Sequence, residues 1–599
     1  MLKKRHFMRK IKTAILPAIS AIMVFSMAPA SVHAANKTVT YTKSTIDESK
    51  TGSLTIRKVI SNSGYSEEGT GLADYELKTD QKPLAGVTFT YIKIADIDQA
   101  VLKDTGILKF ENISAGLTDL STSLGVTLSK TNIGEESCVT TDNLGNLVKT
   151  INAKAGDGAS DAGAVQLEKW ITKNGTSMSA TDKDGYTSAD GLPLGMYLVA
   201  ESSVKETQEA EPTVISSTLP FLVMLPMTNV AEIDGQAAGT LWQYDVTVYP
   251  KNNTASLSKS LLSDDGKSLL TTTDSNMGDE QTMVLNASIP KLTDGRKIET
   301  FAIDDEMDEG LSFVSLDKVT LGTGEWNTEG NATLTSADYT VTSPDSRHFT
   351  LTLTASGLEK INTAGTVLSL YVFYTTTLNH KAAIGTDMSQ NKPVLRIGAD
   401  HAKVVSVQGN KVSVATYEID LTKTAGKTGI DLSETVFQVK EGEQVISFVK
   451  ENDGLYHRAD GDEIKNEATI QVTNEISPDE NGLLKIKGID EGEYVITEIK
   501  TPAGLNLLRD ELTLKIEAPS KVDGSIQKAT LSSGQEDAEE IGIAKNLSDG
   551  IVDLTIKNTS AISTPHTGGS GIYLYVLVGC AVMAGSYFLF NKRRNRKEV

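Results

Sequence analysis

The sequence predicts a mostly β protein built from several sandwich domains in a row. The chain has 599 residues, enough for roughly three or four domains of ordinary size. Leu, Ile, Val and Thr are plentiful, helix-favouring runs are few, and Gly, Asn, Asp and Ser separate short segments. The clearest strand is residues 242–252 (WQYDVTVYPKN), where Tyr244, Val246 and Val248 alternate with the residues between them.

Pro250 is expected to end that strand because proline cannot donate the next ladder hydrogen bond. Lys251 then lies where the strand reaches the surface. By itself, a lysine in this position is most simply interpreted as a solvated side chain.

Both ends of the chain have the pattern of targeting segments and not of folded domains. The first 12 residues carry six Lys and Arg, an apolar stretch follows, and Val32-His33-Ala34 precedes a cleavage point, which predicts a signal peptide over residues 1–34. Residues 571–590 form an uncharged stretch of 20 residues, long enough to span a bilayer as a helix. The basic tail after it is expected to stay cytoplasmic, so the body of the protein lies outside the cell.

Charge and cysteine content exclude several classes of function. The formal net charge is −21, which argues against nucleic acid or anionic membrane as a partner. The two cysteines are Cys138 and Cys580, so an exported chain does without disulfides. The seven histidines form no metal-binding motif, and no GxSxG or paired His/Cys motif supports a hydrolase. We therefore expect no metal, no cofactor and no enzymatic turnover.

Alternating segments divide the body of the chain into an N-terminal domain (35–252), a middle domain (253–415) and a C-terminal domain (416–560). In the first, strands are expected at 51–60, 83–95, 191–201 and 220–226, with residues 96–167 as a polar insertion. In the second they are expected at 255–262, 301–313, 341–355, 367–378 and, as the last strand, 391–397. In the third they are expected at 417–424, 436–440, 482–489, 494–505 and 552–558. Residues 561–599 hold the sequence TPHTGG, the membrane segment and the basic tail.

The three domains share a weak internal repeat. Each has a lysine on its first strand, and two have a Tyr-x-x-x-Glu strand after a glycine turn and an asparagine at the end of the last strand. Each element is weak alone, but the ordered set is stronger. The residues concerned are Lys58, Lys259, Lys423, Tyr197, Glu201, Tyr494, Glu498, Asn252 and Asn558.

At these residues the chain resembles the major backbone pilins of Gram-positive bacteria, which sortases polymerise and anchor to the cell wall. WQYDVTVYPKN resembles the pilin motif of that family, YVITEIKTPAGL (494–505) its E-box, and TPHTGG with the span and basic tail its LPXTG-type sorting signal. Thr564 stands where the motif has leucine, whereas Pro565, Thr567 and Gly568 fit and His566 takes the variable position. The substitution leaves open which sortase accepts the signal.

The resemblance implies tandem immunoglobulin-like β-sandwiches of the Cna type, with a signal peptide and a C-terminal transmembrane helix. It implies that sortase cleaves between Thr567 and Gly568 and passes the Thr567 carboxyl to Lys251 of another subunit. It also implies as partners sortase, other copies of the chain, minor pilins, peptidoglycan after anchoring, and a host surface ligand. The location implied is an extracellular pilus on the cell wall.

The resemblance further implies a lysine–asparagine amide bond inside each domain, assisted by a buried carboxyl. The sets are Lys58, Glu201 and Asn252 in the N-terminal domain and Lys423, Glu498 and Asn558 in the C-terminal domain. In the middle domain they are Lys259, Asp305 and Asn391, with Asp304 as an alternative acid. Burial in a dry core favours both the neutral amine and the protonated carboxyl that the reaction needs.

The implied function is that of a structural shaft subunit. A wall-anchored adhesin, or a tip or basal pilin that binds a host ligand, is the main alternative, and such a subunit would not need Lys251 as a nucleophile. Taken one at a time, the lysines and glutamates are most simply interpreted as snorkelling side chains or surface ion pairs.

Overall fold

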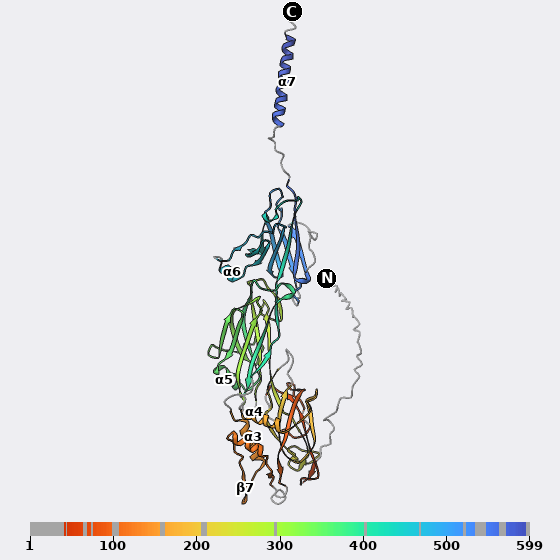
Figure 1. Ribbon diagram of the computed structural model, residues 1–599, viewed down its shortest axis with the longest axis vertical. Helices are drawn as coiled ribbons and strands as arrows, with labels where there is room; N and C mark the ends of the chain where they lie inside the picture. The colour runs from red at the N-terminus through yellow and green to blue at the C-terminus, as the bar shows by residue number, and fades with distance from the viewer. Residues whose placement is uncertain are drawn as a thin grey trace, which may run out of the picture.

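Strands build an elongated molecule in the computed structural model, which places an N-terminal, a middle and a C-terminal sandwich one after another with helix α7 beyond them (Figure 1). The all-β prediction is confirmed for the three bodies. The structure describes residues 41–43, 45–63, 69–73, 76–98, 107–155, 162–204, 213–292, 296–399, 404–466, 469–518, 523–533, 547–561 and 571–594. The predicted signal peptide, residues 1–34, lies outside this part of the chain.

The N-terminal sandwich packs the sheet β10-β2-β16 against the sheet β13-β11-β5-β6. Between them lies an apolar core that includes Leu54, Ile56, Phe89 and Val199. The strands are β1 (Tyr41–Lys43), β2 (Gly52–Arg57), β3 (Val59–Ile60), β4 (Lys82–Pro83), β5 (Val87–Ile97), β6 (Phe110–Glu111), β7 (Thr131–Ile133), β8 (Glu136–Cys138), β9 (Thr176–Ser177), β10 (Tyr186–Leu192), β11 (Gly195–Val204), β12 (Thr213–Ser216), β13 (Phe221–Leu225), β14 (Met227–Thr228), β15 (Leu241–Gln243) and β16 (Asp245–Val248).

Helices that the sequence did not predict lie in the expected polar insertion, residues 96–167, and across its C-terminal end. They are α2 (Ala115–Ser123), α3 (Thr141–Asn152) and α4 (Gly163–Asn174), with the hairpin β7–β8 between the first two. In α3 the buried residues Leu144, Leu147, Val148 and Ile151 recur at helical spacing. They pack with β5 and β11 into a second core, so the helices cover the outer face of this sheet.

Residues 242–252 are not one strand, contrary to prediction. β15 pairs with β1 and β14, whereas β16 pairs in parallel with β2, so the chain changes sheets at Tyr244. Pro250 does interrupt the ladder, but Lys251 begins the next strand instead of ending the last one. That strand, β17 (Lys251–Leu262), starts beside β3 and continues without a break into the middle sandwich.

The middle sandwich packs the sheet containing β22-β26-β20-β17 against the sheet β19-β29-β27-β21-β25-β24. The expected last strand is followed by two more, β28 and β29, and β29 pairs in parallel with β19 near the start of the domain. The elements are β18 (Leu269–Leu270), β19 (Thr272–Asp274), β20 (Glu280–Ile289), β21 (Ile298–Met307), β22 (Leu311–Gly322), β23 (Ala332–Thr333), β24 (Tyr339–Asp345), β25 (His348–Leu353), α5 (Ala355–Thr363), β26 (Leu368–Leu378), η1 (Gly385–Asp387), β27 (Ser389–Ala399), β28 (Val405–Gln408) and β29 (Val412–Ala415).

The C-terminal sandwich packs the sheet β35-β33-β34-β36-β30-β40 against the sheet β32-β31-β37-β38-β39. Its first and last strands, β30 and β40, are parallel neighbours along their whole length. The elements are β30 (Tyr417–Ala425), η2 (Leu432–Glu434), β31 (Val436–Glu441), β32 (Gln444–Val445), β33 (Phe448–Asn452), β34 (Leu455–Arg458), α6 (Gly461–Lys465), β35 (Val472–Thr473), β36 (Leu483–Ile489), β37 (Gly492–Lys500), β38 (Leu512–Glu517), β39 (Lys528–Ser533), η3 (Leu547–Asp549) and β40 (Ile551–Asn558).

Helix α7 (Gly571–Arg594) stands apart from the sandwiches (Figure 1). Its segment Tyr575–Arg593 is long and apolar enough to cross a membrane, and its side chains are exposed along the helix. An exposed apolar helix of this length requires an apolar surrounding, which a bilayer provides.

Candidate functional site

In the N-terminal sandwich, Lys58, Glu201 and Asn252 meet in the core. Lys58 Nζ is 2.7 Å from Glu201 Oε2 and 2.6 Å from Asn252 Oδ1, and all three side chains are buried. Asn252 Nδ2 donates to the other carboxylate oxygen, Glu201 Oε1, at 2.6 Å. Because a carbonyl oxygen lies about 1.2 Å from its carbon, Nζ is within about 4 Å of the amide carbon of Asn252.

The C-terminal sandwich repeats this arrangement with Lys423, Glu498 and Asn558. Lys423 Nζ is 2.8 Å from Glu498 Oε1 and donates a short hydrogen bond to Asn558 Oδ1. Asn558 Nδ2 donates to both Glu498 oxygens at 3.0 and 2.9 Å. Each lysine thus has an amide carbonyl and a carboxylate as neighbours on one side.

Strand register produces the match between the two clusters. Asn252 pairs with Ile60 and Asn558 pairs with Ala425, in both cases across parallel strands and two residues beyond the lysine. Residues two apart in a strand share a face, so each lysine and its asparagine point into the same core.

A glycine that the sequence analysis missed holds each lysine in place. The backbone N–H of Lys58 donates to Gly185 O at 2.7 Å, and that of Lys423 donates to Gly482 O at 2.6 Å. Both glycines have positive φ, and a Cβ on them would lie 2.4 and 2.3 Å from the carbonyl oxygen of the lysine. Only glycine fits such a position. The sequence signal that could have identified these residues is a glycine in the turn that faces the first strand.

An aromatic ring lies beneath each buried amine. Lys58 Nζ is 5.7 Å from the ring centroid of Phe89, and Lys423 Nζ is 5.5 Å from that of Phe437. These phenylalanines sit opposite Glu201 and Glu498 in the antiparallel ladders. The rings exclude water, and burial is the main reason that the pKa values of both lysines are lowered from the ordinary range.

The middle sandwich brings Lys259 and Asp305 together, both fully buried, with Nζ 2.6 Å from Oδ2. Burial lowers the pKa of Lys259 to about 8, although the carboxylate of Asp305 opposes the shift. Asp304, the alternative acid, faces outward instead, where it contacts Arg396 at 2.8 Å and Thr350 Oγ1 at 2.6 Å. Adjacent strand residues point to opposite faces, so only one of the two aspartates can enter the core.

Asn391 is buried near this pair but is linked to it through Tyr374. Asn391 Nδ2 donates to the Tyr374 hydroxyl at 3.2 Å, and that hydroxyl donates a short hydrogen bond to Asp305 Oδ2. Lys259 Nζ lies 5.0 Å from the centroid of the Tyr374 ring. Asn391 Oδ1 and Asp305 Oδ1 are buried with no hydrogen-bond partner among the described residues, so two acceptors near the amine are unsatisfied.

Family models match the N-terminal and C-terminal parts of the chain. The family model for the Gram-positive pilin subunit D1, N-terminal domain, matches residues 35–253, which contain the whole first cluster and Lys251. Residues 35–253 thus form a Gram-positive pilin D1 domain. Models for a prealbumin-like fold domain and for the LPXTG cell wall anchor motif match residues 417–530 and 557–598 of the chain.

Two fimbrial proteins and several solved pilins are similar to this chain. Fimbrial subunit type 2 of Actinomyces naeslundii is 28% identical over 217 residues, which cover 35% of this chain and 36% of that relative. Fimbrial subunit type 1 of Actinomyces viscosus is 25% identical over 475 residues, which cover 71% of this chain and 79% of that relative. The full-length major pilin SpaD from Corynebacterium diphtheriae is 19% identical, with 86% of this chain and 99% of SpaD covered and a TM-score of 0.47.

Lys251 lies next to the first cluster but faces away from it. Its side chain is half-buried, and Nζ donates to Tyr249 O at 3.2 Å. Its backbone is bound to the cluster, because Thr218 Oγ1 donates to Lys251 O at 3.2 Å and accepts from Lys58 Nζ at 2.5 Å. The predicted sorting residues, Thr564, Pro565, His566, Thr567 and Gly568, lie outside the described residues.

Proposed function

We propose that the chain is a structural shaft subunit of a cell-surface pilus, joined to its neighbours through Lys251 and the carboxyl of Thr567. The observation that carries the proposal is the pairing, in one chain, of a pilin D1 domain that ends just after Lys251 with a wall-anchor motif at the other end. One end supplies an amine and the other supplies an acyl group. A subunit with both forms a chain of indefinite length.

Sortase carries out the joining reaction. It cleaves the Thr567–Gly568 amide and holds Thr567 as a thioester on its cysteine, releasing the membrane segment with Gly568 at its new N-terminus. The neutral amine of Lys251 on another copy attacks the thioester, an amide forms, and the sortase thiol is released. The last subunit is transferred to peptidoglycan by the same chemistry. Sortase, other copies of the chain and peptidoglycan are thus the proposed partners, with minor pilins added at defined places.

Within each end sandwich, we propose that lysine and asparagine condense once. The carboxyl of Glu201 or Glu498 accepts a proton from the buried ammonium, which frees the amine to attack the amide carbon. The new carbon–nitrogen bond forms as the old one breaks. The carboxyl gives its proton to the leaving nitrogen, which departs as ammonia, and it then takes up the second proton that the attacking nitrogen loses, so it ends protonated. The contacts of Asn252 and Asn558 with both the amine and the carboxylate support this order of events.

The middle sandwich is proposed to use Lys259, Asp305 and Asn391 in the same roles. A shift of Lys259 toward Asn391 Oδ1 would satisfy one of the unpaired acceptors and bring the amine to its target. Asp305→Asn is expected to block the condensation, so the chain retains one ammonia, whereas Asp304→Asn is expected to leave the mass deficit unchanged. Equal mass deficits in the two variants would exclude Asp305 as the assisting acid.

The proposed bonds explain how such a chain resists pulling. In the C-terminal sandwich the tie joins β30 to β40, the first and last strands, which lie side by side in parallel. Force that enters at one strand and leaves at the other then passes through a covalent bond and not through the hydrogen bonds of the ladder. The sandwich itself does not need to unfold under load. The chemistry happens once per domain, so the protein does not act as an enzyme with turnover.

Denaturing gels of cell-wall extracts test the shaft proposal. Cells that make the natural chain should show a ladder of high-mass species, and Lys251→Ala should reduce it to monomer. Lys183→Ala is the matched control, since Lys183 is an exposed lysine of the same domain paired with Asp184. Monomer alone from the natural chain would favour the alternative, a wall-anchored adhesin or a tip or basal subunit that binds a host ligand.

A further inference from the structure

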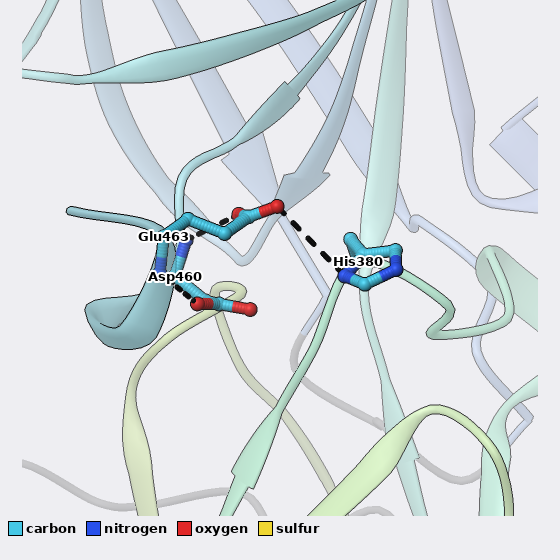
Figure 2. Close-up of side chains that lie close together, drawn as sticks. All are labelled: His380, Asp460 and Glu463. Carbon is cyan, nitrogen blue, oxygen red and sulfur yellow. Dashed lines mark hydrogen bonds and ion pairs between the residues drawn. The ribbon is translucent and has the colours of Figure 1, made fainter. Parts of the chain in front are cut away.

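A histidine of the middle sandwich and two carboxylates of the C-terminal sandwich converge where these bodies meet (Figure 2). His380 follows β26, and Asp460 and Glu463 lie at the start of α6. One ligand atom of each lies within 4.8 Å of the other two, and Glu463 Oε1 is 3.8 Å from His380 Nδ1. We propose that this cluster binds a divalent transition-metal ion of the Zn²⁺ type and thereby ties the two sandwiches together.

His457 brings a further ring nitrogen to the cluster. It is buried, its Nδ1 is 2.9 Å from Glu451 Oε1, and its Nε2 is 3.0 and 3.1 Å from the two oxygens of Glu463. A neutral imidazole donates from one nitrogen and offers the lone pair of the other, whereas a protonated imidazole donates from both. In the tautomer whose Nδ1–H donates to Glu451, the lone pair of Nε2 faces Glu463 and is placed to bind an ion that Glu463 holds.

The spacing of the ligand atoms suits a tetrahedral ion. Zinc bonds of about 2.0–2.1 Å to nitrogen and oxygen place neighbouring ligand atoms about 3.3 Å apart. Glu463 Oε1 lies 3.0 Å from His457 Nε2 and 3.8 Å from His380 Nδ1, on either side of that value. His380 is half-exposed, so its ring can rotate to complete the site. Nitrogen ligands favour Zn²⁺, Co²⁺ or Ni²⁺ over Ca²⁺ and Mg²⁺, which prefer oxygen alone.

Backbone contacts hold the ligands near one another before any ion binds. Gly278 N donates to Leu378 O at 2.9 Å, just before His380, and a Cβ on Gly278 would lie 3.0 Å from Asp460 Cα. Asp460 and Glu463 also fix each other, since Asp460 N donates to Glu463 Oε2 at 3.0 Å and Glu463 N donates to Asp460 Oδ1 at 2.9 Å. A site assembled in advance binds its ion at less cost in conformational entropy.

The surrounding charge also favours a cation. Glu451, Asp460 and Glu463 bring three carboxylates to the cluster, and Lys487 Nζ, 3.6 Å from Glu451 Oε2, partly offsets them. The proposed internal bonds lie within single sandwiches and do not cross this joint. Elsewhere the joint is held by hydrogen bonds such as Met277 N to Gly488 O at 3.0 Å and Glu491 N to Asp274 Oδ2 at 2.9 Å. A bound ion would therefore stiffen the contact between the middle and C-terminal sandwiches, which the proposed internal bonds do not cross-link.

Metal titration of the full-length chain in detergent tests the site. Metal-free protein is titrated with ZnCl₂ by calorimetry and with CoCl₂ by visible absorption, which reports tetrahedral nitrogen and oxygen ligation. One ion per chain is expected, with affinity lowered at least about tenfold in His380→Ala and in Glu463→Gln. His348→Ala is the matched control because His348 Nε2 also has a carboxylate, Asp304, at 3.9 Å, and its affinity is expected to be unchanged.

Two results would overturn the proposal. One is the lack of saturable binding, and the other is an affinity that His380→Ala and Glu463→Gln leave unchanged, which would place the ion elsewhere. His380 is half-exposed, so His380→Ala is expected to melt at the same temperature as the natural chain without metal. Zinc is expected to raise the melting temperature of the natural chain and not that of this variant.

Discussion

Glu498→Gln is the sharpest test of the proposed internal bonds. The substitution keeps the size of the side chain but removes the carboxyl, so no group remains to take the proton from Lys423. Each bond releases one ammonia of about 17 Da, so three bonds give the natural chain a mass about 51 Da below the value calculated from its processed sequence. The variant is expected to show a deficit of about 34 Da against its own calculated mass.

The stability change can be estimated from the structure. Lys423 and Asn558 are 135 residues apart, and a crosslink over such a loop contributes about 5 kcal/mol by the chain-entropy model developed for disulfides. Loss of the carboxylate also leaves the buried Lys423 amine without its 2.8 Å partner, which adds on the order of 3 kcal/mol. A domain of this size loses roughly 2–4 °C per kcal/mol, so a loss of about 8 kcal/mol is expected to lower the melting temperature of the C-terminal sandwich by on the order of 15–30 °C.

Intact-mass spectrometry and calorimetry measure the two effects on the same sample. Glu493→Gln is the matched control, because Glu493 lies on the same strand β37 but is exposed to solvent. Its mass deficit and melting temperature are expected to equal those of the natural chain. A full deficit of about 51 Da in Glu498→Gln would refute the assigned role of the carboxyl, and no deficit in the natural chain would refute the bonds themselves.

Three further outcomes follow from the same geometry. Gly482→Ala is expected to lower the yield of the bond between Lys423 and Asn558, because its Cβ would lie 2.3 Å from Lys423 O. Intact-mass spectrometry measures the yield as the fraction of chains that retain the ammonia. Gly504→Ala, which also has a positive φ but has no atom within 4 Å of its Cβ, is expected to leave the yield unchanged. In Asn391→Ala the middle bond cannot form, and Lys259 keeps a pKa of about 8 against the ordinary 10.5. Between pH 8 and pH 10.5 the unfolded chain binds more protons than the folded chain, so the free energy of unfolding is expected to rise with pH, by on the order of 3 kcal/mol. Chemical denaturation at several pH values measures this rise. The rise is expected to disappear when Lys259→Met is added to Asn391→Ala. Deletion of α7 with the tail after it should release the protein into the medium, and retention of the shortened chain on cells would contradict the role of that helix as a membrane stop.

The sequence predicted the β class and most strands because alternation is a local property of each segment. Helix α3 was not predicted, because the polar composition of the segment hides the helical spacing of Leu144, Leu147, Val148 and Ile151. The sequence also predicted one continuous strand where the structure has β15 and β16. Alternation continues through Tyr244, and nothing local reveals that the chain changes its pairing partner there.

The assignment of the candidate clusters shows the same division. The order of residues together with the resemblance to pilins selected Lys58, Glu201 and Asn252, and the structure places them within hydrogen-bond distance. Order alone left Asp304 and Asp305 as alternatives, and the choice depends on which face of β21 enters the core. Tyr374, which stands between Asp305 and Asn391, belongs to no motif and was not predicted.

Sequence alone therefore determined the class of the fold, the address at the C-terminus and the members of the end clusters, because each depends on residue type and order. Tertiary structure alone decided which side chains share a core: the two-residue offset across parallel strands, the glycines behind the lysines and the ring beneath each amine. It alone also brought His380 to Asp460 and Glu463, which belong to different sandwiches. Contacts between distant segments depend on strand pairing and on how one body sits on the next, and neither is a local property of the chain.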